Sequence, residues 1–528
     1  MASHPLLLLT ILSCLHHAFA LNILAIVSLP LQSHYMAVHP LFRELAAKGH
    51  SVTVMNNYPD KNAHKNMQFI DLDQDGNNVG YITPMDFYET FDSNYLHLYN
   101  FFRHFQLSPG STKADCENFF TNENAKAHFD KGIKYDVIFV EMFMGECGLA
   151  YAGALYDAPI IGITSHVMLP SAYPRLGIPF NFDSDAFYFS NGGPNPSLYH
   201  KTEAVILDFI YNMYVKWYMH GLIYEVFDQY LPINTLDMEK VTMKRLKMMF
   251  VYQHYSLTGA RLLAPQVLEI GGIHIAQPKP VPESIKKFLA DAEHGAIYVS
   301  FGSNLKANTM TPEKLQEFLK AFKKIPQKVI WKFENASLPE GYDDYVYTDT
   351  WMPQVDVLCN PKVIGFVSHG GMLSLSEAAY CGKPAVVMPF FGDQFGNAAS
   401  AQAVGLSQTL YFDRLTADSL ADAIEEITST KMQENAKRIS KLWHDRPMPA
   451  MDSAIYWTEY VARHQSAPPS LPSKQSAWYE KILLDVAIVI LILISPVLLT
   501  IAFIIKFLNL IISKIFLALF GKKKTKKD

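Results

Sequence analysis

The chain has 528 residues, enough for two or three domains, and a formal net charge of −5 from 45 basic and 50 acidic residues. This balance excludes proteins that bind nucleic acids through a large basic excess, and we expect no nucleic-acid partner. Hydrophobic residues make up 49% of the chain and aromatic residues 13%, which indicates membrane segments together with large cores. The cysteines form an odd and sparse set, from which we expect no disulfide framework. They are Cys14, Cys116, Cys147, Cys359 and Cys381.

The N-terminus carries a short apolar run, residues 6–15, followed by Ala18-Phe19-Ala20. Small residues at this spacing are typical of a cleavage site, so we predict a signal peptide over residues 1–20. An uncleaved anchor is the alternative interpretation.

The first domain begins with a β-α-β pattern. A strand-like run over residues 22–28 precedes a helical pattern over 39–48 and a second strand over 52–55, which predicts a doubly wound domain. His34 lies in the loop after the first strand, at the edge where open α/β sheets bind ligands. A further strand, residues 135–141, ends in Glu141 at the same edge.

Aromatic residues recur in two later segments of this half. Between residues 81 and 105 they suit either the core of helices or the wall of an apolar pocket. Residues 170–196 mix them with Pro, Gly, Asn and Ser, which suits an acceptor site for an apolar molecule. A loop packed on its own domain or touching the membrane is the alternative. Helices are predicted over residues 202–231 and 243–249.

Four prolines between residues 264 and 282 mark a linker, and we place a domain boundary close to it. The second domain opens with a strand over 296–301, followed by Gly302-Ser303-Asn304. Thr311 and Pro312 then form a strong helix start, with a capping side chain before proline at the first helical position. A further strand is predicted over 328–333.

The segment from Trp351 to Gln394 is the most informative part of the chain. It predicts a buried strand over 363–367, a break at Ser368-His369-Gly370-Gly371, and a helix that ends at Gly382. A glycine pair lets a ligand approach the backbone, and the start of a helix favours phosphate. His369 can add a hydrogen bond or a positive charge.

Three polar residues of the same segment complete a ligand site. Glu377 lies six residues beyond Gly371, and Asp393-Gln394 follows the next strand at the same edge of the sheet. A carboxylate beside an amide suits a polyol, whose hydroxyl groups need both acceptors and donors. The segment therefore predicts a site for a phosphate joined to sugars. An ordinary β-α-β unit, with glycines only in a tight turn, is the alternative.

The whole segment resembles the signature of the UDP-glycosyltransferase family. The shared elements are Trp-x-Pro-Gln, Phe-x-Ser/Thr-His-Gly-Gly, a Glu six residues on, Gly-x-Pro and Pro-x-x-x-Asp-Gln. One position departs, because many members have Asn where this chain has Leu373. The resemblance implies an α/β fold of GT-B type, with two Rossmann-like doubly wound domains facing a cleft and a C-terminal transmembrane helix.

The resemblance also implies roles for individual residues. The Ser-His-Tyr around His34 is similar to a family motif whose histidine is the general base. Glu141 stands where the family commonly has an Asp that orients this base, and Glu146 is the alternative partner. UDP-sugar contacts are implied for Gly302, Ser303, Trp351, Gln354, His369, Gly371, Glu377, Asp393 and Gln394. Asn397 is a further candidate for a nucleotide or sugar contact.

The expected co-substrate is UDP-glucose. Members that use glucuronic acid tend to carry an Arg at a position that aligns loosely with Tyr252, and without this cation a sugar carboxylate is poorly matched. We expect no cofactor, and no metal because the phosphate site has no Asp-x-Asp cluster nearby.

The C-terminus predicts a membrane anchor. Residues 486–505 contain no charge and are long enough to span a bilayer. The shorter apolar run that follows, residues 507–520, is expected at the interface, and the positive-inside rule puts the basic tail in the cytosol. Lys524 and Lys526 resemble a dilysine signal for retrieval to the endoplasmic reticulum, with a basic stop-transfer flank as the alternative.

The predicted domains are a signal peptide (1–20), an acceptor-binding domain (21–270), a UDP-sugar-binding domain (271–465), a linker (466–485), a transmembrane helix (486–505) and a basic tail (506–528). We expect a single-pass type I protein of the endoplasmic reticulum membrane, with lumenal catalytic domains, a glycosylation sequon at Asn335 and possible homo-oligomers.

The expected reaction transfers a hexose, with glucose favoured, from a UDP-sugar to a hydroxyl group of a small lipophilic acceptor, with inversion, in detoxification or clearance. Two alternatives are the glycosylation of a membrane lipid and a non-catalytic carrier of lipophilic molecules in the endoplasmic reticulum.

Overall fold

The computed structural model describes residues 20–73, 76, 83–143, 145–334, 338–465, 471, 476–481 and 483–521. The predicted signal peptide, apart from Ala20, lies outside these residues, as do the sequon at Asn335, half of the predicted linker and the dilysine tail. The chain divides into two compact units, a body over Met1–Leu471 and a C-terminal unit over Pro472–Asp528.

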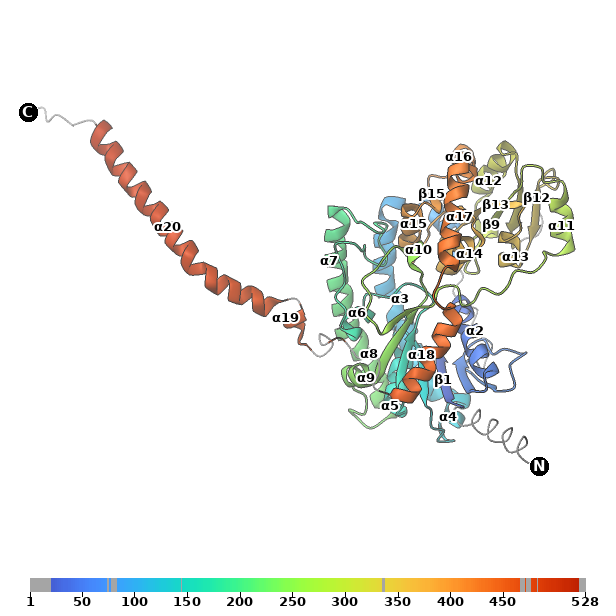
Figure 1. Ribbon diagram of the computed structural model, residues 1–528, viewed down its shortest axis with the longest axis horizontal. Helices are drawn as coiled ribbons and strands as arrows, with labels where there is room; N and C mark the ends of the chain where they lie inside the picture. The colour runs from blue at the N-terminus through green and yellow to red at the C-terminus, as the bar shows by residue number, and fades with distance from the viewer. Residues whose placement is uncertain are drawn as a thin grey trace, which may run out of the picture. The chain divides into compact units, whose positions relative to one another are not determined.

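The first sheet of the body has seven parallel strands in the order β3-β2-β1-β5-β6-β7-β8. Its strands are nearly continuous apolar runs because helices cover both faces of a parallel sheet (Figure 1). The strand order reverses between β1 and β5, which places a ligand crevice at their carboxyl ends. The strands are β1 (Asn22–Val27), β2 (Ser51–Asn56), β3 (Met67–Asp71), β5 (Val137–Glu141), β6 (Ile160–Ile163), β7 (Leu246–Val251) and β8 (Val267–Glu269).

The second sheet has six parallel strands in the order β12-β11-β9-β13-β14-β15, and its order reverses between β9 and β13. The strands are β9 (Ala296–Ser300), β11 (Lys328–Lys332), β12 (Val346–Asp349), β13 (Val363–Ser368), β14 (Ala385–Val387) and β15 (Ser407–Thr409). Two doubly wound sheets within one body agree with the GT-B expectation. The predicted domain boundaries themselves stay predictions.

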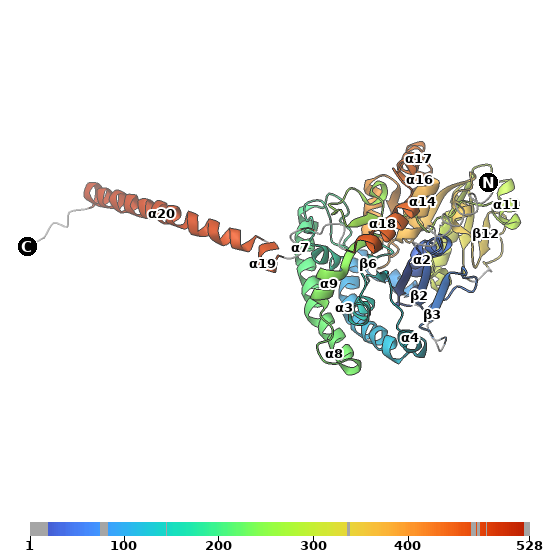
Figure 2. The same ribbon diagram turned by 60° about the horizontal axis from the view of Figure 1, so that its bottom comes forward.

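Helices of both halves surround the sheets (Figures 1 and 2). In the N-terminal half they are α2 (Gln32–Ala47), α3 (Ser93–Thr121), α4 (Glu123–Phe129), α5 (Cys147–Leu155), α6 (Ala172–Leu176), α7 (Leu198–Met213), α8 (His220–Tyr230), α9 (Met238–Arg245) and α10 (Tyr255–Thr258). In the C-terminal half they are α11 (Glu283–Ala290), α12 (Pro312–Lys324), α13 (Gln354–Leu358), α14 (Met372–Cys381), α15 (Gln394–Ala403), α16 (Ala417–Thr428), α17 (Thr430–His444) and α18 (Ala450–His464).

Several contacts join the two halves of the body. A short parallel pair links β4 (Thr83–Pro84) to β10 (Leu305–Lys306). Helix α18 crosses back to the first half, where Figure 1 shows it beside β1 and α2. There the carboxylate of Glu459 lies 3.3 Å from Nε2 of His50. These contacts hold the carboxyl edges of the two sheets on opposite sides of one cavity.

The helix start predicted at Thr311 is confirmed, since its hydroxyl group accepts a hydrogen bond from the backbone N–H of Lys314. The helix predicted over residues 243–249 is wrong. Helix α9 ends at Arg245, and Leu246–Val251 forms the buried strand β7 between β6 and β8. Burial within the sheet outweighs the weak helix preference of this short apolar run.

The expectation that the cysteines make no disulfide framework is also wrong, because four of them are paired. Cys116 is bonded to Cys147, which joins α3 to the start of α5, and Cys359 is bonded to Cys381 in the second half. The pairs are 31 and 22 residues apart in sequence, so the fold brings them together in a way that their spacing did not indicate. A sparse set of cysteines can therefore still be paired.

The C-terminal unit contains α19 (Trp478–Lys481) and α20 (Leu484–Phe520). Helix α20 has 37 residues and contains an 18-residue stretch with a mean hydropathy of 3.1, and it is the one helix among the described residues that is long and apolar enough to cross a membrane. The helix continues through Pro496, so the apolar run over residues 507–520 belongs to the same helix, and its expected place at the membrane interface stays a prediction.

Candidate active site

A cavity of about 720 Å³ lies between the carboxyl edges of the two sheets. His34 lines one side of it. The predicted UDP-sugar contacts all line it as well, namely Gly302, Ser303, Trp351, Gln354, His369, Gly371, Glu377, Asp393 and Gln394. Glu141 stands behind this surface, where it contacts His34. The fold thus brings residues from across the chain into one site.

His34 and Glu141 form a close pair at the strand-order reversal of the first sheet. Nδ1 of His34 lies 2.5 Å from Oε1 of Glu141, and both side chains are largely buried. Because a carboxylate accepts the Nδ1 proton, Nε2 of His34 is the nitrogen left to take a proton. His34 lies in the first turn of α2 and not in a loop as predicted, because the helix begins at Gln32.

Glu146, the alternative partner for His34, belongs to a different cluster. Its carboxylate contacts the guanidinium group of Arg175 and lies 3.2 Å from Nε2 of His220. Burial alone would raise the pKa of Glu146, but Arg175 and His220 together lower it. This arrangement leaves Glu141 as the carboxylate beside His34.

Two titratable groups near the pair were missed by sequence reasoning. Asp115 accepts a hydrogen bond of 3.0 Å from the hydroxyl group of Ser28, and burial, with a smaller contribution from Glu141, raises its pKa to about 7. The ring of His166 lies 5.7 Å from that of His34, and burial lowers the pKa of His166 to about 3, so this ring is neutral. Both come from segments without a recognisable motif.

Three glycines around His369 shape the turn at the second strand-order reversal. A Cβ atom on Gly302 would lie 2.7 Å from Cε1 of His369, and one on Gly371 would lie 2.6 Å from Nε2 of the same ring. Gly370 adopts a φ of +86°, which side chains disfavour. The turn therefore requires glycine, and it aims the N-terminus of α14 into the cavity.

Burial, assisted by the charge of Lys332, lowers the pKa of His369 to about 4. The ring is therefore neutral at physiological pH, which disfavours the positive charge that we considered for His369 and leaves the hydrogen bond as its predicted role. The cation at this edge is instead Lys332, which ends β11 and lines the cavity.

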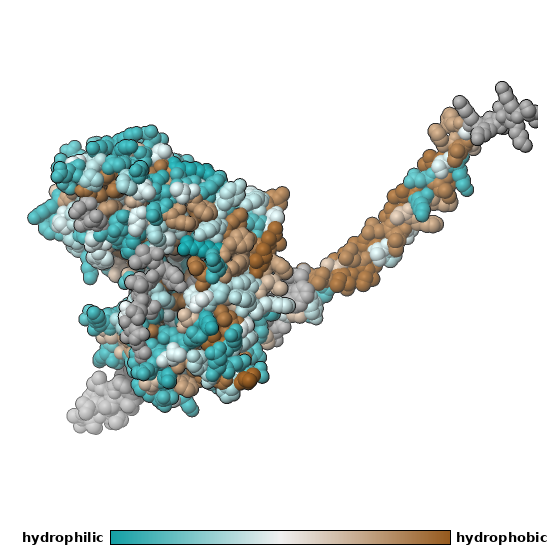
Figure 3. All heavy atoms as spheres, turned by 180° about the vertical axis from the view of Figure 1, so that it is seen from behind, coloured by the Kyte–Doolittle hydropathy of each residue, from teal (hydrophilic) through white to brown (hydrophobic). Residues whose placement is uncertain are grey.

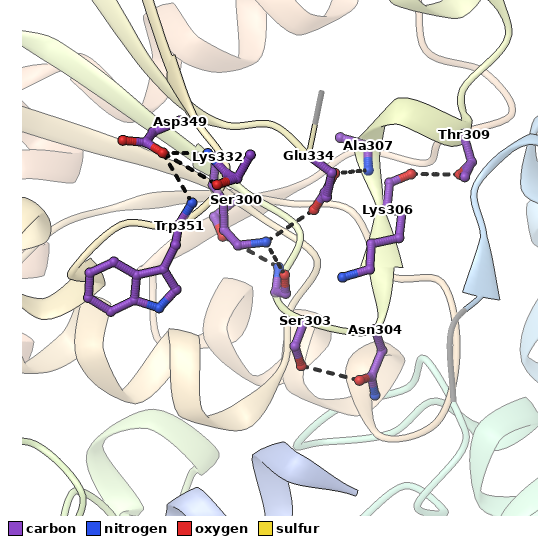
Figure 4. A network of polar contacts seen from close by, with 12 residues as sticks. Ser300, Ser303, Asn304, Lys306, Ala307, Thr309, Lys332, Glu334, Asp349 and Trp351 are labelled. Carbon is purple, nitrogen blue, oxygen red and sulfur yellow. Dashed lines mark hydrogen bonds and ion pairs between the residues drawn. The ribbon is translucent and has the colours of Figure 1, made fainter. Parts of the chain in front are cut away.

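Lys332 donates hydrogen bonds to the carbonyl oxygen of Gly302 (2.9 Å) and to Oε1 of Glu334 (3.1 Å). Figure 4 shows the bond between Lys332 and Glu334. In the same view the indole ring of Trp351 extends from the end of β12, apart from this network. The side chain of Trp351 is 69% exposed, so the ring is not part of the core and the cavity is open beside it. A flat, exposed aromatic ring suits a nucleotide base.

Both carboxylate oxygens of Glu377 have a hydrogen-bonding partner. Its Oε2 accepts a hydrogen bond of 2.5 Å from the side-chain amide of Gln354, and its Oε1 lies 3.0 Å from Nε2 of His274. His274 in turn contacts the hydroxyl group of the fully buried Tyr252. His274 lines the cavity and was missed by sequence reasoning, whereas Tyr252 lies behind it.

Hydrogen bonds made by residues of α15 hold Asp393 and Gln394, the polar pair that follows β14, in place. The amide oxygen of Gln394 accepts hydrogen bonds from the backbone N–H groups of Phe390 (2.8 Å) and Phe391 (3.1 Å). Asn397 donates to Oδ2 of Asp393 (2.7 Å) and to the carbonyl oxygen of Gly370 (3.0 Å). Asn397 is not among the residues lining the cavity, so it supports the site without the direct ligand contact that we considered.

The remaining wall of the cavity comes from the first half and mixes apolar with polar side chains. Its apolar residues include Met36, Leu107, Phe143, Tyr188 and Phe189, and its polar residues include Asn100, Arg103, His104, Ser165 and His166. The aromatic residues predicted for this region divide between two roles, since Tyr188 and Phe189 line the cavity whereas Phe101 is buried in the core. At the second-domain wall Leu373 presents an apolar side chain where an amide was considered.

Among the described residues, no group of three or more His, Cys, Asp or Glu side chains is arranged to hold a metal ion. The expectation of a metal-free reaction stays a prediction.

Comparisons with known proteins agree with this architecture. The family model described as "UDP-glucoronosyl and UDP-glucosyl transferase" matches residues 25–524. The UDP-glycosyltransferase UGT5 of Dactylopius coccus is 31% identical over 517 residues, covering 93% of each chain, and the UDP-glucosyltransferase 2 of the same species is 30% identical, covering 88% of each. The solved structure of LpCGTa in complex with UDP shares the fold, with a TM-score of 0.53 at 16% identity over 83% of this chain and 99% of that one.

Proposed function

This chain belongs to the UDP-glucoronosyl and UDP-glucosyl transferase family, and we propose that it transfers glucose from UDP-glucose to a hydroxyl group of a small lipophilic acceptor, with inversion at the anomeric carbon. One observation carries the proposal. The His34–Glu141 pair lies on one wall of a single cavity, and the polar groups suited to a UDP-sugar lie on the other.

The mechanism follows from this arrangement. Nε2 of His34 takes the proton of the acceptor hydroxyl group while its oxygen bonds to the anomeric carbon and the bond from that carbon to UDP breaks. The attack comes from the face opposite UDP, so the configuration inverts. The carboxylate of Glu141 stabilises the imidazolium ion that forms, and general-base catalysis of this kind contributes a rate factor of roughly 10²–10⁴.

The leaving diphosphate requires stabilisation of its growing negative charge. The N-terminus of α14 offers backbone N–H groups, and Lys332 supplies a positive charge beside Gly302. Glu377 and Asp393 supply acceptors for sugar hydroxyl groups, and Trp351 offers a face for the uracil ring. These roles extend the contacts described above to a bound donor.

Glucose is favoured over glucuronic acid because of the charges in the cavity. A sugar carboxylate needs a free cation beside the donor. Lys332 is already engaged by Glu334 and lies beside the phosphate turn, and the other lining cation, Arg103, belongs to the wall from the first half. The 30% identity with a protein named UDP-glucosyltransferase 2 supports the same choice.

We place the body in the lumen of the endoplasmic reticulum, anchored by α20 as a single-pass type I protein. The disulfides of both halves support an oxidising compartment, since such bonds are rare in the cytosol. An apolar acceptor wall and a membrane anchor suit the detoxification or clearance of lipophilic phenols and alcohols.

The test incubates membranes that carry the full chain with labelled UDP-glucose or UDP-glucuronic acid and a panel of phenols and steroids, with products identified by mass. We expect a glucoside that is lost in His34→Ala, while UDP still binds this variant. Transfer that survives in His34→Ala would refute the base. No product from either donor, despite UDP binding, would refute the acceptor class.

A further inference from the structure

Helix α7 and the single turn of π-helix that continues it, Tyr214–Met219, expose an apolar surface to the outside of the body. Eight residues from Val205 to Tyr218 are exposed, and seven of them are aliphatic or aromatic. We name these seven the α7 face: Val205, Ile206, Phe209, Ile210, Met213, Trp217 and Tyr218. In Figure 3 apolar side chains form a stripe on this part of the body.

The eighth exposed residue of this stretch is Lys216, which is charged. The outer face of a helix in water normally carries mostly charged and polar side chains, so a face with seven apolar residues is unusual. Phe209 is 66% exposed and Trp217 is 70% exposed. Contiguous apolar surfaces of this kind mark sites that bind another molecule or a membrane. We therefore expect the α7 face to contact an apolar partner.

The α7 face adjoins the mouth of the catalytic cavity through α3. Figures 1 and 2 both show α3 beside α7, and the hydroxyl groups of Ser108 and Tyr214 are 2.8 Å apart. The neighbouring residue Leu107 lines the cavity and is also 46% exposed. The cavity thus opens to the outside at Leu107. The next residue, Ser108, contacts Tyr214 in the segment that carries the α7 face.

The length of the tether indicates what the α7 face meets. Helix α18 ends at His464 and α20 begins at Leu484, so nineteen residues, 465–483, separate the body from the apolar helix. Even a fully extended tether of this length reaches only roughly 70 Å. A body held this close to a membrane has lipid as its most abundant apolar neighbour. Trp and Tyr, both present in the face, are enriched at membrane interfaces.

We propose that the α7 face rests on the lipid bilayer into which α20 inserts, and that the cavity mouth beside it takes lipophilic acceptors directly from the lipid. An apolar helix face lying in the interface plane is a known way for a protein to contact a membrane. The docking stands by itself, whereas the entry route rests on the proposed function.

The docking is tested by fluorescence quenching in the full chain, reconstituted into phosphatidylcholine nanodiscs with brominated acyl chains. The signal of Trp217 is the difference between the wild type and Trp217→Phe. Trp351, which is similarly exposed but lies in the cavity, is measured in the same way through Trp351→Phe. Leu491→Trp, in the middle of the apolar stretch of α20, reports insertion of the anchor.

We expect strong quenching of Trp217 and of the tryptophan at position 491, and little quenching of Trp351. An unquenched Trp217 beside a quenched anchor would overturn the docking. Cross-linking through a cysteine placed at Phe209 that joins two copies in the same nanodiscs would also overturn it, in favour of a second copy as the partner.

The entry route is tested by kinetics in the same nanodiscs with Phe209→Glu. A charge in the face opposes its insertion, so we expect the apparent KM for a long-chain alkylphenol to rise about tenfold. The KM values for a water-soluble phenol and for UDP-glucose should not change. Tyr456→Glu, at an exposed aromatic residue on α18, is the matched control and should change none of them.

Equal changes for both phenols in Phe209→Glu would overturn the entry route. Absence of transfer by the wild type to either phenol would refute the proposed function and the entry route together. The docking would be unaffected by that result, because quenching decides it without catalysis.

Discussion

Glu141→Gln isolates the charge of the carboxylate beside His34. Glutamine keeps the length of the side chain and an oxygen that accepts the Nδ1 proton, so the 2.5 Å contact between His34 and Glu141 is replaced by a neutral hydrogen bond. The imidazolium ion formed during transfer then lacks its counter-charge. With charge centres about 4 Å apart and an effective dielectric constant of about 20, the lost interaction is about 4 kcal/mol, or nearly 10³ in rate.

We expect kcat of Glu141→Gln to fall by about 10²–10³, with the KM for UDP-glucose nearly unchanged, because the residue lies behind the acceptor side of the cavity. The acid limb of kcat/KM should also move to lower pH, since the protonated imidazole is no longer stabilised. Initial rates over a range of pH, with the product measured by mass, provide the assay.

Glu146→Gln is the matched control, five residues along the chain. It removes a buried charge that is paired with Arg175, so it should lower the melting temperature while leaving the pH profile of the folded enzyme unchanged. A wild-type pH profile in Glu141→Gln, or a shifted profile in Glu146→Gln, would refute the assignment of Glu141.

Three further predictions concern other parts of the site and the fold. The wild type should lose stability as pH rises from about 4 to about 7, because burial raises the pKa of Asp115 and the folded state tolerates this carboxyl group only while it is protonated; Asp115→Asn should remove that loss. Above pH 7 the variant should be more stable than the wild type by at most about 4 kcal/mol, and thermal melts of the variant whose stability still falls with pH as in the wild type would contradict the prediction. Trp351→Ala should raise the KM for UDP-glucose by about 5–100-fold through lost stacking of the base, and an unchanged donor KM would reject the uracil contact. Cys359→Ser should cost about 2–4 kcal/mol in denaturant unfolding, with reduced wild type as the comparison, and equal stability would show that the Cys359–Cys381 bond contributes little.

The donor side of the site was predictable from sequence because its chemistry constrains local residues. The turn after β13 requires glycines around His369, and the helix that follows ends at Gly382 with a φ of +65°. These demands leave a dense pattern within Trp351–Gln394. Glu141 was predictable for a similar reason, since it directly ends a buried strand at the ligand edge of the sheet.

Other features depend on contacts between distant segments. Helix α2 has no side-chain hydrogen bond at its N-terminus, so nothing in the sequence marks its early start, and His34 was placed in a loop. His274 contacts Glu377 although the two residues are 103 positions apart in the sequence, so no local pattern indicates the contact. Lys332 had one available signal, a lysine at the carboxyl end of a strand beside the phosphate turn. The disulfides follow from tertiary proximity alone.

The anomeric configuration of the product tests the central claim most directly. Wild-type protein in membranes is incubated with UDP-α-glucose and a simple phenol, and the glycoside is examined by proton NMR. A base on one wall and a donor on the opposite wall of one cavity predict a β-glucoside, formed in a single displacement. An α-glucoside would contradict this account, because retention requires an attack that this arrangement of His34 and the donor site does not provide.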